Sequence, residues 1–157
     1  LLYGVTGSGK TQVYLRLVQE VLRQGRNAIV LVPEIVLTPQ MMSKFASCFG
    51  SKVVMLHSSL PMTERCDQWK RIRDGSATVI VGTRSAVFAP LSNLGMIVID
   101  EEHEHTYKSE SNPKYHARDV AAYRVGQNNA LMLLASATPS LESYYKAEKG
   151  IYTLPNS

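Results

Sequence analysis

Apolar residues along this chain follow two patterns that alternate from one end to the other. Short continuous apolar runs, typical of parallel strands buried on both faces, fall at residues 1–3, 28–32, 53–56, 77–81, 96–99 and 131–135. Between them, apolar residues recur at helical spacing, which predicts helices around 14–22, 39–49, 62–72, 117–125 and 140–149. This alternation predicts an α/β fold with one doubly wound, mostly parallel sheet.

Individual residues set the ends of the predicted helices. Thr38 precedes the second helix as an N-cap, and Pro39 takes the first helical position, where its missing N–H costs nothing. Gly25 and Gly50 follow helices, because glycine adopts positive φ without a steric penalty. Trp69 lies at a core spacing of the third helix, which favours packing, and base stacking is the alternative.

Composition limits the classes of protein that fit. The 157 residues, 45% of them hydrophobic, can bury one core, and no run approaches the ~18 apolar residues of a membrane span. The net charge of +4 permits a nucleic-acid partner without demonstrating one. The chain starts inside its first strand without a methionine, so we expect residues 1–157 to be one lobe of a longer protein. Cys48 and Cys66 occupy apolar helix positions, which predicts buried, reduced thiols in a cytosolic protein.

The most informative motif follows the first strand. Residues 4–11 fit G-x-x-x-x-G-K-[ST], a loop whose backbone N–H groups surround nucleotide phosphates. Lys10 is expected to act as a mobile charge for the β- and γ-phosphates, and the Thr11 hydroxyl as a ligand of Mg²⁺. The predicted nucleotide-binding residues are Gly4, Thr6, Gly7, Ser8, Gly9, Lys10 and Thr11. A flexible Gly/Ser connector is the alternative, but the strand before it and the helix after it favour a phosphate site.

A second motif follows the fifth apolar run. There the chain reads Asp100-Glu101-Glu102-His103, an acidic end to a buried strand. In P-loop NTPases such a position places an aspartate in the shell of Mg²⁺. We expect Asp100 to do this and Glu101 to orient and deprotonate the attacking water. An acidic surface loop is the alternative for the motif taken by itself.

Together these motifs resemble the superfamily 2 DExH helicases, and within them the family of bacterial replication-restart DNA helicases. The motifs that carry the resemblance are residues 4–11, Leu-Val-Pro-Glu-Ile at 31–35, Leu-Thr-Pro-Gln at 37–40, Gly-Thr-Arg-Ser-Ala at 82–86, residues 100–104, Tyr-His-Ala-Arg-Asp at 115–119 and Ser136-Ala137-Thr138. They cover essentially the whole chain in one order, which makes the resemblance specific.

The resemblance implies a first RecA-like motor lobe that uses ATP and Mg²⁺, with Lys10, Asp100, Glu101 and His103 catalytic. It implies movement from 3′ to 5′ on single-stranded DNA, action on branched DNA, and a location in the bacterial cytoplasm. It also implies a second lobe, which carries an arginine finger and a zinc-binding insertion. Other primosome proteins and single-strand binding protein are the implied partners.

Four positions are expected to contact DNA: Thr38 and Gln40 at the start of a helix, and Arg84 and Ser85 after a strand. A helix N-terminus attracts phosphates, but capping explains Thr38 equally well. Arg84 lies at the ligand edge of the sheet, and a solvated or paired surface charge is its alternative.

Coupling between nucleotide and DNA is expected at two places. Ser136 and Thr138 lie close enough in topology to hydrogen-bond His103, although a helix-capping role competes. Residues 104–115, here called segment 104–115, resemble the aromatic-rich loop of these helicases, with Tyr107 and Tyr115 as its aromatics. A mobile surface loop without an anchoring residue is the alternative.

Two further functions remain open at this stage. The chain by itself could bind ATP or ADP without turnover, because an absent arginine finger removes about 10³–10⁵ in rate. The motifs also allow a motor on RNA or double-stranded DNA.

Overall fold

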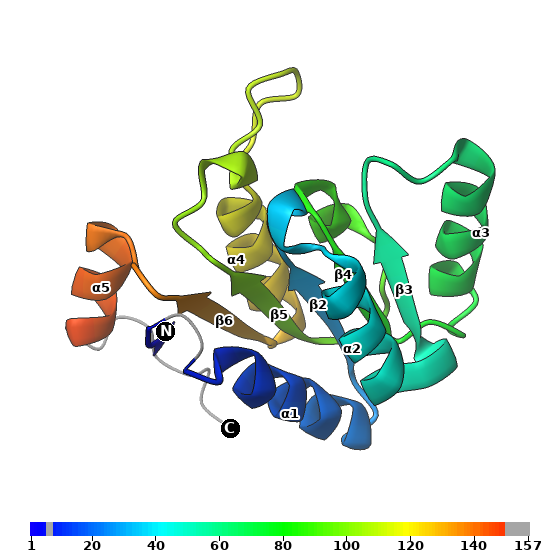
Figure 1. Ribbon diagram of the computed structural model, residues 1–157, viewed down its shortest axis with the longest axis horizontal. Coiled ribbons are helices and arrows are strands. Elements are labelled where there is room, and N and C mark those ends of the chain that lie inside the picture. Colours follow the sequence, from blue (N-terminus) through cyan, green and yellow to red (C-terminus); the bar gives the residue numbers. More distant parts are fainter. Residues whose placement is uncertain (6–7, 150–157) are drawn as a thin grey trace.

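The computed structural model describes residues 1–5 and 8–149 and contains a six-stranded sheet in the order β1-β6-β5-β2-β4-β3 (Figure 1). Each neighbouring pair of strands is parallel. The strands are β1 (Leu2–Tyr3), β2 (Asn27–Leu31), β3 (Val53–Leu56), β4 (Val79–Gly82), β5 (Leu94–Asp100) and β6 (Leu131–Ser136). The predicted α/β fold with a doubly wound parallel sheet is confirmed.

Five helices connect or follow these strands in the described residues. They are α1 (Lys10–Arg23), α2 (Pro39–Phe49), α3 (Met62–Arg73), α4 (Ala117–Asn128) and α5 (Leu141–Glu148). Four 3₁₀ turns lie in the connections: η1 (Glu34–Val36), η2 (Gly50–Lys52), η3 (Arg84–Phe88) and η4 (His105–Tyr107). As predicted, Thr38 caps α2 by accepting the Met41 N–H at 3.2 Å, with Pro39 in the first turn.

The two faces of the sheet form two separate cores, because alternate residues of a strand point to opposite faces. In β2, Ile29 and Leu31 pack with residues of α3 and α4, whereas Val30 packs with residues of α1 and α2. Figure 1 shows these helices covering the sheet from both sides. All of these strand residues are fully buried, which is why the strands read as continuous apolar runs.

The prediction for the two cysteines is wrong. Cys48 and Cys66 are both exposed. Helix α3 lies at the outer edge of the sheet beside β3 and fully buries only Ile72, so Cys66 faces solvent despite its spacing (Figure 1). Helix α2 buries only Phe45 and Phe49, a stripe too narrow to include Cys48.

The carboxyl ends of the parallel strands lie along one edge of the sheet, where α/β proteins bind ligands. The strand order divides this edge into two halves. On one half, β1, β6 and β5 end at Tyr3, Ser136 and Asp100. On the other, β2, β3 and β4 end next to η1, His57 and Thr83.

Candidate functional site

The loop between β1 and α1 brings Lys10 into the first half of this edge, where β1, β6 and β5 end. Gly9 takes a left-handed conformation (φ 84°) directly before α1, and no side chain caps this helix. Lys10 is 8% exposed, and its ammonium donates to the carbonyls of Gly4 at 2.5 Å and Val5 at 2.9 Å. Lys10 is thus held by the carbonyls of its own loop in this structure, and its role as a charge for the β- and γ-phosphates stays a prediction. Two predicted phosphate-binding residues, Thr6 and Gly7, lie outside the described residues.

Asp100, at the end of β5, is a buried carboxylate fixed by two hydrogen bonds. Oδ2 accepts the Tyr14 hydroxyl at 2.9 Å, and Oδ1 accepts the Glu101 N–H at 2.9 Å. Burial raises the pKa of the Asp100 carboxyl, and the bond from Tyr14 opposes this in part. The same Tyr14 hydroxyl also interacts with the Thr11 side chain. Tyr14 thus joins the two predicted Mg²⁺ ligands, although its position in the sequence predicted only a core residue.

The chemistry of these groups fits Mg²⁺. Hydroxyl and carboxylate oxygens are ligands that this ion prefers. Within residues 1–5 and 8–149, no three His, Cys, Asp or Glu side chains cluster as a metal site. Mg²⁺ at phosphates requires no such cluster, since it usually takes one or two carboxylates together with phosphate and water oxygens.

The rest of the acidic motif forms a turn that faces β6. Glu101 has positive φ (48°), and its carbonyl accepts the Glu104 N–H at 2.9 Å. Its carboxylate lies 3.7 Å from His103 Nδ1. His103 Nδ1 in turn shares a hydrogen bond of 2.7 Å with Ser136 Oγ, and Thr138 Oγ1 lies 3.3 Å from Nε2.

The predicted bonds between His103 and the two hydroxyls are therefore present. The competing capping role is not seen, because Ser140 is the residue that caps α5. Glu102, which sequence reasoning left without a role, is buried at the centre of a further set of contacts.

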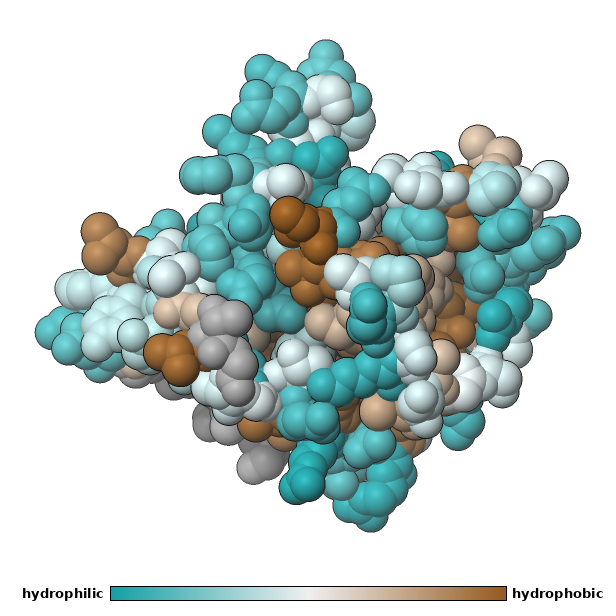
Figure 2. Space-filling view, in the orientation of Figure 1, coloured by the Kyte–Doolittle hydropathy of each residue, from teal (hydrophilic) through white to brown (hydrophobic). Residues whose placement is uncertain are grey.

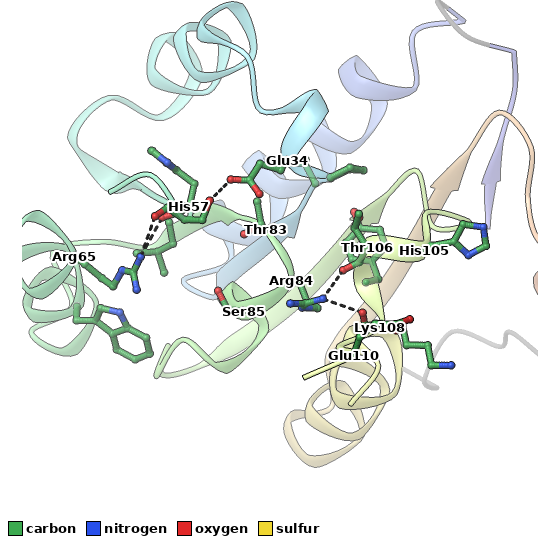
Figure 3. A pocket seen from close by; sticks show the side chains of 16 residues that line it. Glu34, His57, Arg65, Thr83, Arg84, Ser85, His105, Thr106, Lys108 and Glu110 are labelled. Atoms are coloured by element: carbon green, nitrogen blue, oxygen red, sulfur yellow. Dashed lines mark hydrogen bonds between the residues drawn. The ribbon is translucent and has the colours of Figure 1, made fainter. Parts of the chain in front are cut away.

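The other half of the edge contains a pocket of about 730 Å³ (Figure 3). Residues of β2–η1, β3, α3, β4–η3 and segment 104–115 line it, among them Glu34, His57, Arg65, Trp69, Arg84, Ser85 and Lys108. Arg65 makes only weak 3.5 Å contacts, to the carbonyls of His57 and Ser58. The sequence analysis missed His57 and Arg65. The only clue to them was that they follow the third strand, whose carboxyl end had to lie at this edge.

Arg84 is a paired residue in this structure. Its guanidinium donates to the carbonyls of Thr106 at 3.1 Å and Lys108 at 2.8 Å, as Figure 3 shows, and lies 5.9 Å from the Tyr115 ring centroid. The turn that carries it requires Gly82, where a Cβ would lie 2.5 Å from the Leu56 carbonyl oxygen. Ser85 lines the same pocket, whereas Thr38 and Gln40 are exposed outside its lining.

Segment 104–115 has an anchor that the sequence analysis did not foresee. Tyr107 is 1% exposed, and its hydroxyl donates to the carbonyls of Asp100 at 2.5 Å and Leu31 at 3.1 Å. Its ring is therefore buried and does not present a face for base stacking. Tyr115 is half-buried and packs edge-on against Phe88, with ring centroids 4.8 Å apart. A bridge between Lys108 and His116 closes the segment at its base.

This combination defines a RecA-like nucleotide-binding lobe: a parallel sheet with a P-loop lysine after β1 and an aspartate, glutamate and histidine at the end of β5, with β6 between the two strands. The chain belongs to the DEAD/DEAH box helicase family, whose model matches residues 1–147.

Curated proteins that this chain resembles include replication restart proteins. It is 54% identical over 98% of its length to "Replication restart protein PriA" of Bacillus subtilis (strain 168) and 50% identical to the protein of that name from Chlamydia pneumoniae. The chain spans about a fifth of their length, 19% and 21% respectively. The resemblance to the replication-restart family is thereby confirmed.

Solved structures agree on the fold. RecG bound to a three-way DNA junction superposes with a TM-score of 0.67 at 25% identity, over 95% of this chain and 19% of that one. The helicase domain of Pyrococcus furiosus Hef gives a TM-score of 0.65 at 22% identity, over 96% of this chain and 32% of that one. Among the described residues, no helix combines the length and apolar character that crossing a membrane requires.

Proposed function

We propose that this chain is the nucleotide-binding lobe of an ATP-dependent DNA helicase that acts in the restart of replication. The observation that carries the proposal is the division of one sheet edge. Its first half holds Lys10, Asp100, Glu101 and His103, and its second half holds a pocket with two arginines. Residues 1–157 form a single lobe of a longer protein, in keeping with the larger size of the curated relatives.

The residues in the first half of the edge have separate roles in phosphoryl transfer from ATP to water. Lys10 exchanges its two carbonyl partners for the β- and γ-phosphates of ATP, because a phosphate oxygen carries more negative charge than a carbonyl. Backbone N–H groups of the loop from Thr6 to Thr11 neutralise the remaining charge of these phosphates; Thr6 and Gly7 lie outside the described residues. Glu101 accepts the proton of the attacking water. His103 Nδ1 lies 3.7 Å from the Glu101 carboxylate, on the side of β6.

Thr11 and Asp100 are the residues that hold Mg²⁺. When bound, the ion neutralises charge on the phosphates. Asp100 is buried, so its carboxylate is poorly hydrated. Its negative charge, which water no longer stabilises, would be stabilised by a bound cation. The Tyr14 hydroxyl orients both side chains.

Single-stranded DNA occupies the second half of the edge. Arg84 and Ser85 line the pocket, and Thr38 and Gln40 extend the track along the start of α2. Arg65 and Arg84 approach the pocket from different elements, which suits successive phosphates of one strand (Figure 3). Trp69 forms part of the wall, where a base can contact the exposed portion of its ring.

Coupling between the two halves runs through Tyr107 and Tyr115 and through Ser136 and Thr138. Tyr107 touches the carbonyl of the Mg²⁺ ligand Asp100, and its segment is held by Arg84 on the DNA side. Ser136 and Thr138 contact His103 from β6. A DNA phosphate that binds Arg84 would release its hydrogen bonds to segment 104–115. The segment also carries Tyr107, which is hydrogen-bonded to the Asp100 carbonyl, so DNA binding would affect the ATP site.

The wider function follows the relatives. We infer movement from 3′ to 5′, a second lobe that completes the ATP site, and branched DNA as a substrate, in line with the RecG complex with a three-way junction. Primosome proteins and single-strand binding protein are the inferred partners, and the bacterial cytoplasm is the inferred location.

The test is ATP hydrolysis by the full-length protein with no polynucleotide, with single-stranded DNA, with duplex DNA and with RNA. The proposal predicts the largest stimulation by single-stranded DNA. Equal or greater stimulation by RNA or duplex DNA would show that the motor acts on that nucleic acid instead. Binding of ATP without turnover under every condition would identify a binding module instead.

A further inference from the structure

Glu102 is the one residue of the Asp-Glu-Glu-His motif to which the proposed chemistry gives no task. It is also the most deeply buried of the four: the residue is 3% exposed, and its side chain 0%. Burying a charge costs free energy of folding unless other groups pair with it. The partners of Glu102 therefore indicate its role.

One set of partners lies at the start of α5. Oε1 of Glu102 accepts the Ser140 N–H at 2.7 Å, and Oε2 accepts the Ser143 hydroxyl at 3.0 Å. The Glu102 N–H donates to the Ala135 carbonyl of β6 at 3.1 Å. Glu102 therefore fastens the turn that carries Glu101 both to β6 and to the N-terminus of the helix that follows Ser136 and Thr138.

The other partner is Arg118, in the first turn of α4. Arg118 Nη1 lies 3.5 Å from Glu102 Oε2 and 3.4 Å from the Ser143 hydroxyl, and Nη2 lies 3.7 Å from Glu142 Oε2. Helix α4 begins directly after His116, the residue whose bridge to Lys108 closes segment 104–115. Three elements thus meet at one buried carboxylate: the turn of residues 101–104 after β5, here called the DExH turn, helix α5, and helix α4, which begins just after segment 104–115.

We infer that Glu102 and Arg118 are a positioning pair for the hydrolysis reaction. Glu102 holds the backbone of the DExH turn so that Glu101 faces the attacking water. Arg118 links the position of Glu101 to the position of α4 and of segment 104–115, because it pairs with Glu102 from the first turn of α4. The pair touches neither nucleotide nor DNA, and it is separate from the contacts of His103 with Ser136 and Thr138. The inference rests on the proposed function, because it assigns residues that support the same ATP site.

A positioning role and a merely structural ion pair predict different kinetics. Glu102→Gln keeps the volume and, through its amide oxygen, an acceptor for the Ser140 N–H. It removes the charge that faces Arg118 and places an NH₂ group where Oε2 accepted the Ser143 hydroxyl. With single-stranded DNA in excess, we expect kcat to fall about 10- to 100-fold, as for a displaced catalytic group, while the KM for ATP changes less than about threefold.

Arg118 supplies the second half of the test. Arg118→Gln should lower kcat by a similar factor, and Arg118→Lys should recover part of the loss because it restores the charge without the planar fork. The double variant of Glu102→Gln and Arg118→Gln should lose no more than about threefold beyond either single one, because each removes the same interaction. Glu142→Gln is the matched control. Glu142 contacts the same arginine from an exposed position, and we expect a change of less than about twofold.

Several results would overturn the inference. A folded Glu102→Gln variant with wild-type kcat is one, and losses that multiply in the double variant are another. If Glu102→Gln does not fold, Arg118→Gln decides alone, and a wild-type kcat in that variant refutes the pair. A wild-type protein that hydrolyses no ATP refutes the proposed function and, with it, this inference, whereas an active wild type with unaffected variants refutes the inference alone.

Discussion

Asp100 and Glu101 are adjacent carboxylates in very different surroundings. Asp100 is 5% exposed and fixed by Tyr14 and a backbone N–H, whereas Glu101 projects from a turn toward His103. A fixed, desolvated carboxylate suits a metal ligand, and a carboxylate on the open side of a turn suits a base that must meet water.

This difference predicts distinct effects of two isosteric substitutions. Glu101→Gln should bind Mg·ATP with an affinity within about threefold of the wild type and lose at least about 100-fold in kcat, because the amide cannot accept the proton. Asp100→Asn should instead weaken nucleotide binding in the presence of Mg²⁺ and have little effect in EDTA. Equilibrium titration with a fluorescent nucleotide, with and without the metal, measures both. The same affinity in the two variants would contradict the division of roles.

At this scale the sequence predicted which residues meet, but not all of their surroundings. His103 meets Ser136 and Thr138 as expected, because parallel strands place their carboxyl ends together. Glu102 could not be told apart from its acidic neighbours, because its burial depends on α4 and α5, which are distant in the sequence.

Among the elements, segment 104–115 is held in part by one arginine from η3. Arg84 is the predicted DNA contact, and in this structure it donates to two carbonyls of the segment. Arg84→Ala should weaken binding of single-stranded DNA and reduce the slope of log K against log salt by about one unit for each lost phosphate contact. Arg84→Lys should keep most of the slope, since it keeps the charge.

Arg16, on the exposed face of α1 and outside the pocket lining, is the control for this prediction. Arg16→Ala should leave the salt slope unchanged. A slope unaffected by Arg84→Ala would limit Arg84 to holding the segment, and an equal loss in both variants would point to a general effect of charge.

Helix α4 has a cap that titrates. His116 Nδ1 accepts the Arg118 N–H at 3.1 Å, and burial, followed by the nearby Arg118 charge, lowers the pKa of His116 below its ordinary 6.5. The neutral ring is thus favoured in the folded chain. Its contribution to stability is present above the ordinary pKa and is lost as the pH falls through that value toward the lowered one.

We therefore expect acid to destabilise the wild type more than a His116→Asn variant, whose amide caps the helix without titrating. Between about pH 7.5 and about pH 5, the free energy of unfolding in urea should fall by about 1 kcal/mol more in the wild type, the usual worth of an N-cap bond. The same pH dependence in both proteins would exclude His116 as the cause.

The elements themselves were largely predictable. The six apolar runs became the six strands, and the Thr38 cap and the ends of the helices lie within a few residues of their predicted places. Segment 104–115 contains no aliphatic residue, so its own residues gave no sign of an anchor and left a mobile surface loop as the alternative. Tyr107 is the anchor, because its hydroxyl donates to carbonyls at the ends of β2 and β5. These acceptors belong to distant strands, so the residues of the segment alone do not predict the contact.

For the molecule as a whole, the order of strands explains how one lobe can hold two ligands. The P-loop, the DExH turn and Ser136 share one half of the sheet edge, and the pocket with Arg65 and Arg84 occupies the other. Figure 2 shows a mainly hydrophilic face with apolar side chains exposed in only a few places. The alternation of apolar runs and helical spacings predicted this architecture, whereas the pocket depends on strand order, which no single stretch of sequence specifies.

The central claim is that the P-loop and the DExH turn hydrolyse ATP in response to single-stranded DNA. The most direct measurement is the steady-state ATPase rate of the full-length protein at saturating single-stranded DNA, compared between the wild type and a Lys10→Ala variant of unchanged melting temperature. The account predicts that the variant loses at least about 100-fold of the rate, or roughly 2.7 kcal/mol of transition-state stabilisation. A folded Lys10→Ala variant that hydrolyses ATP at a near-normal rate would contradict it.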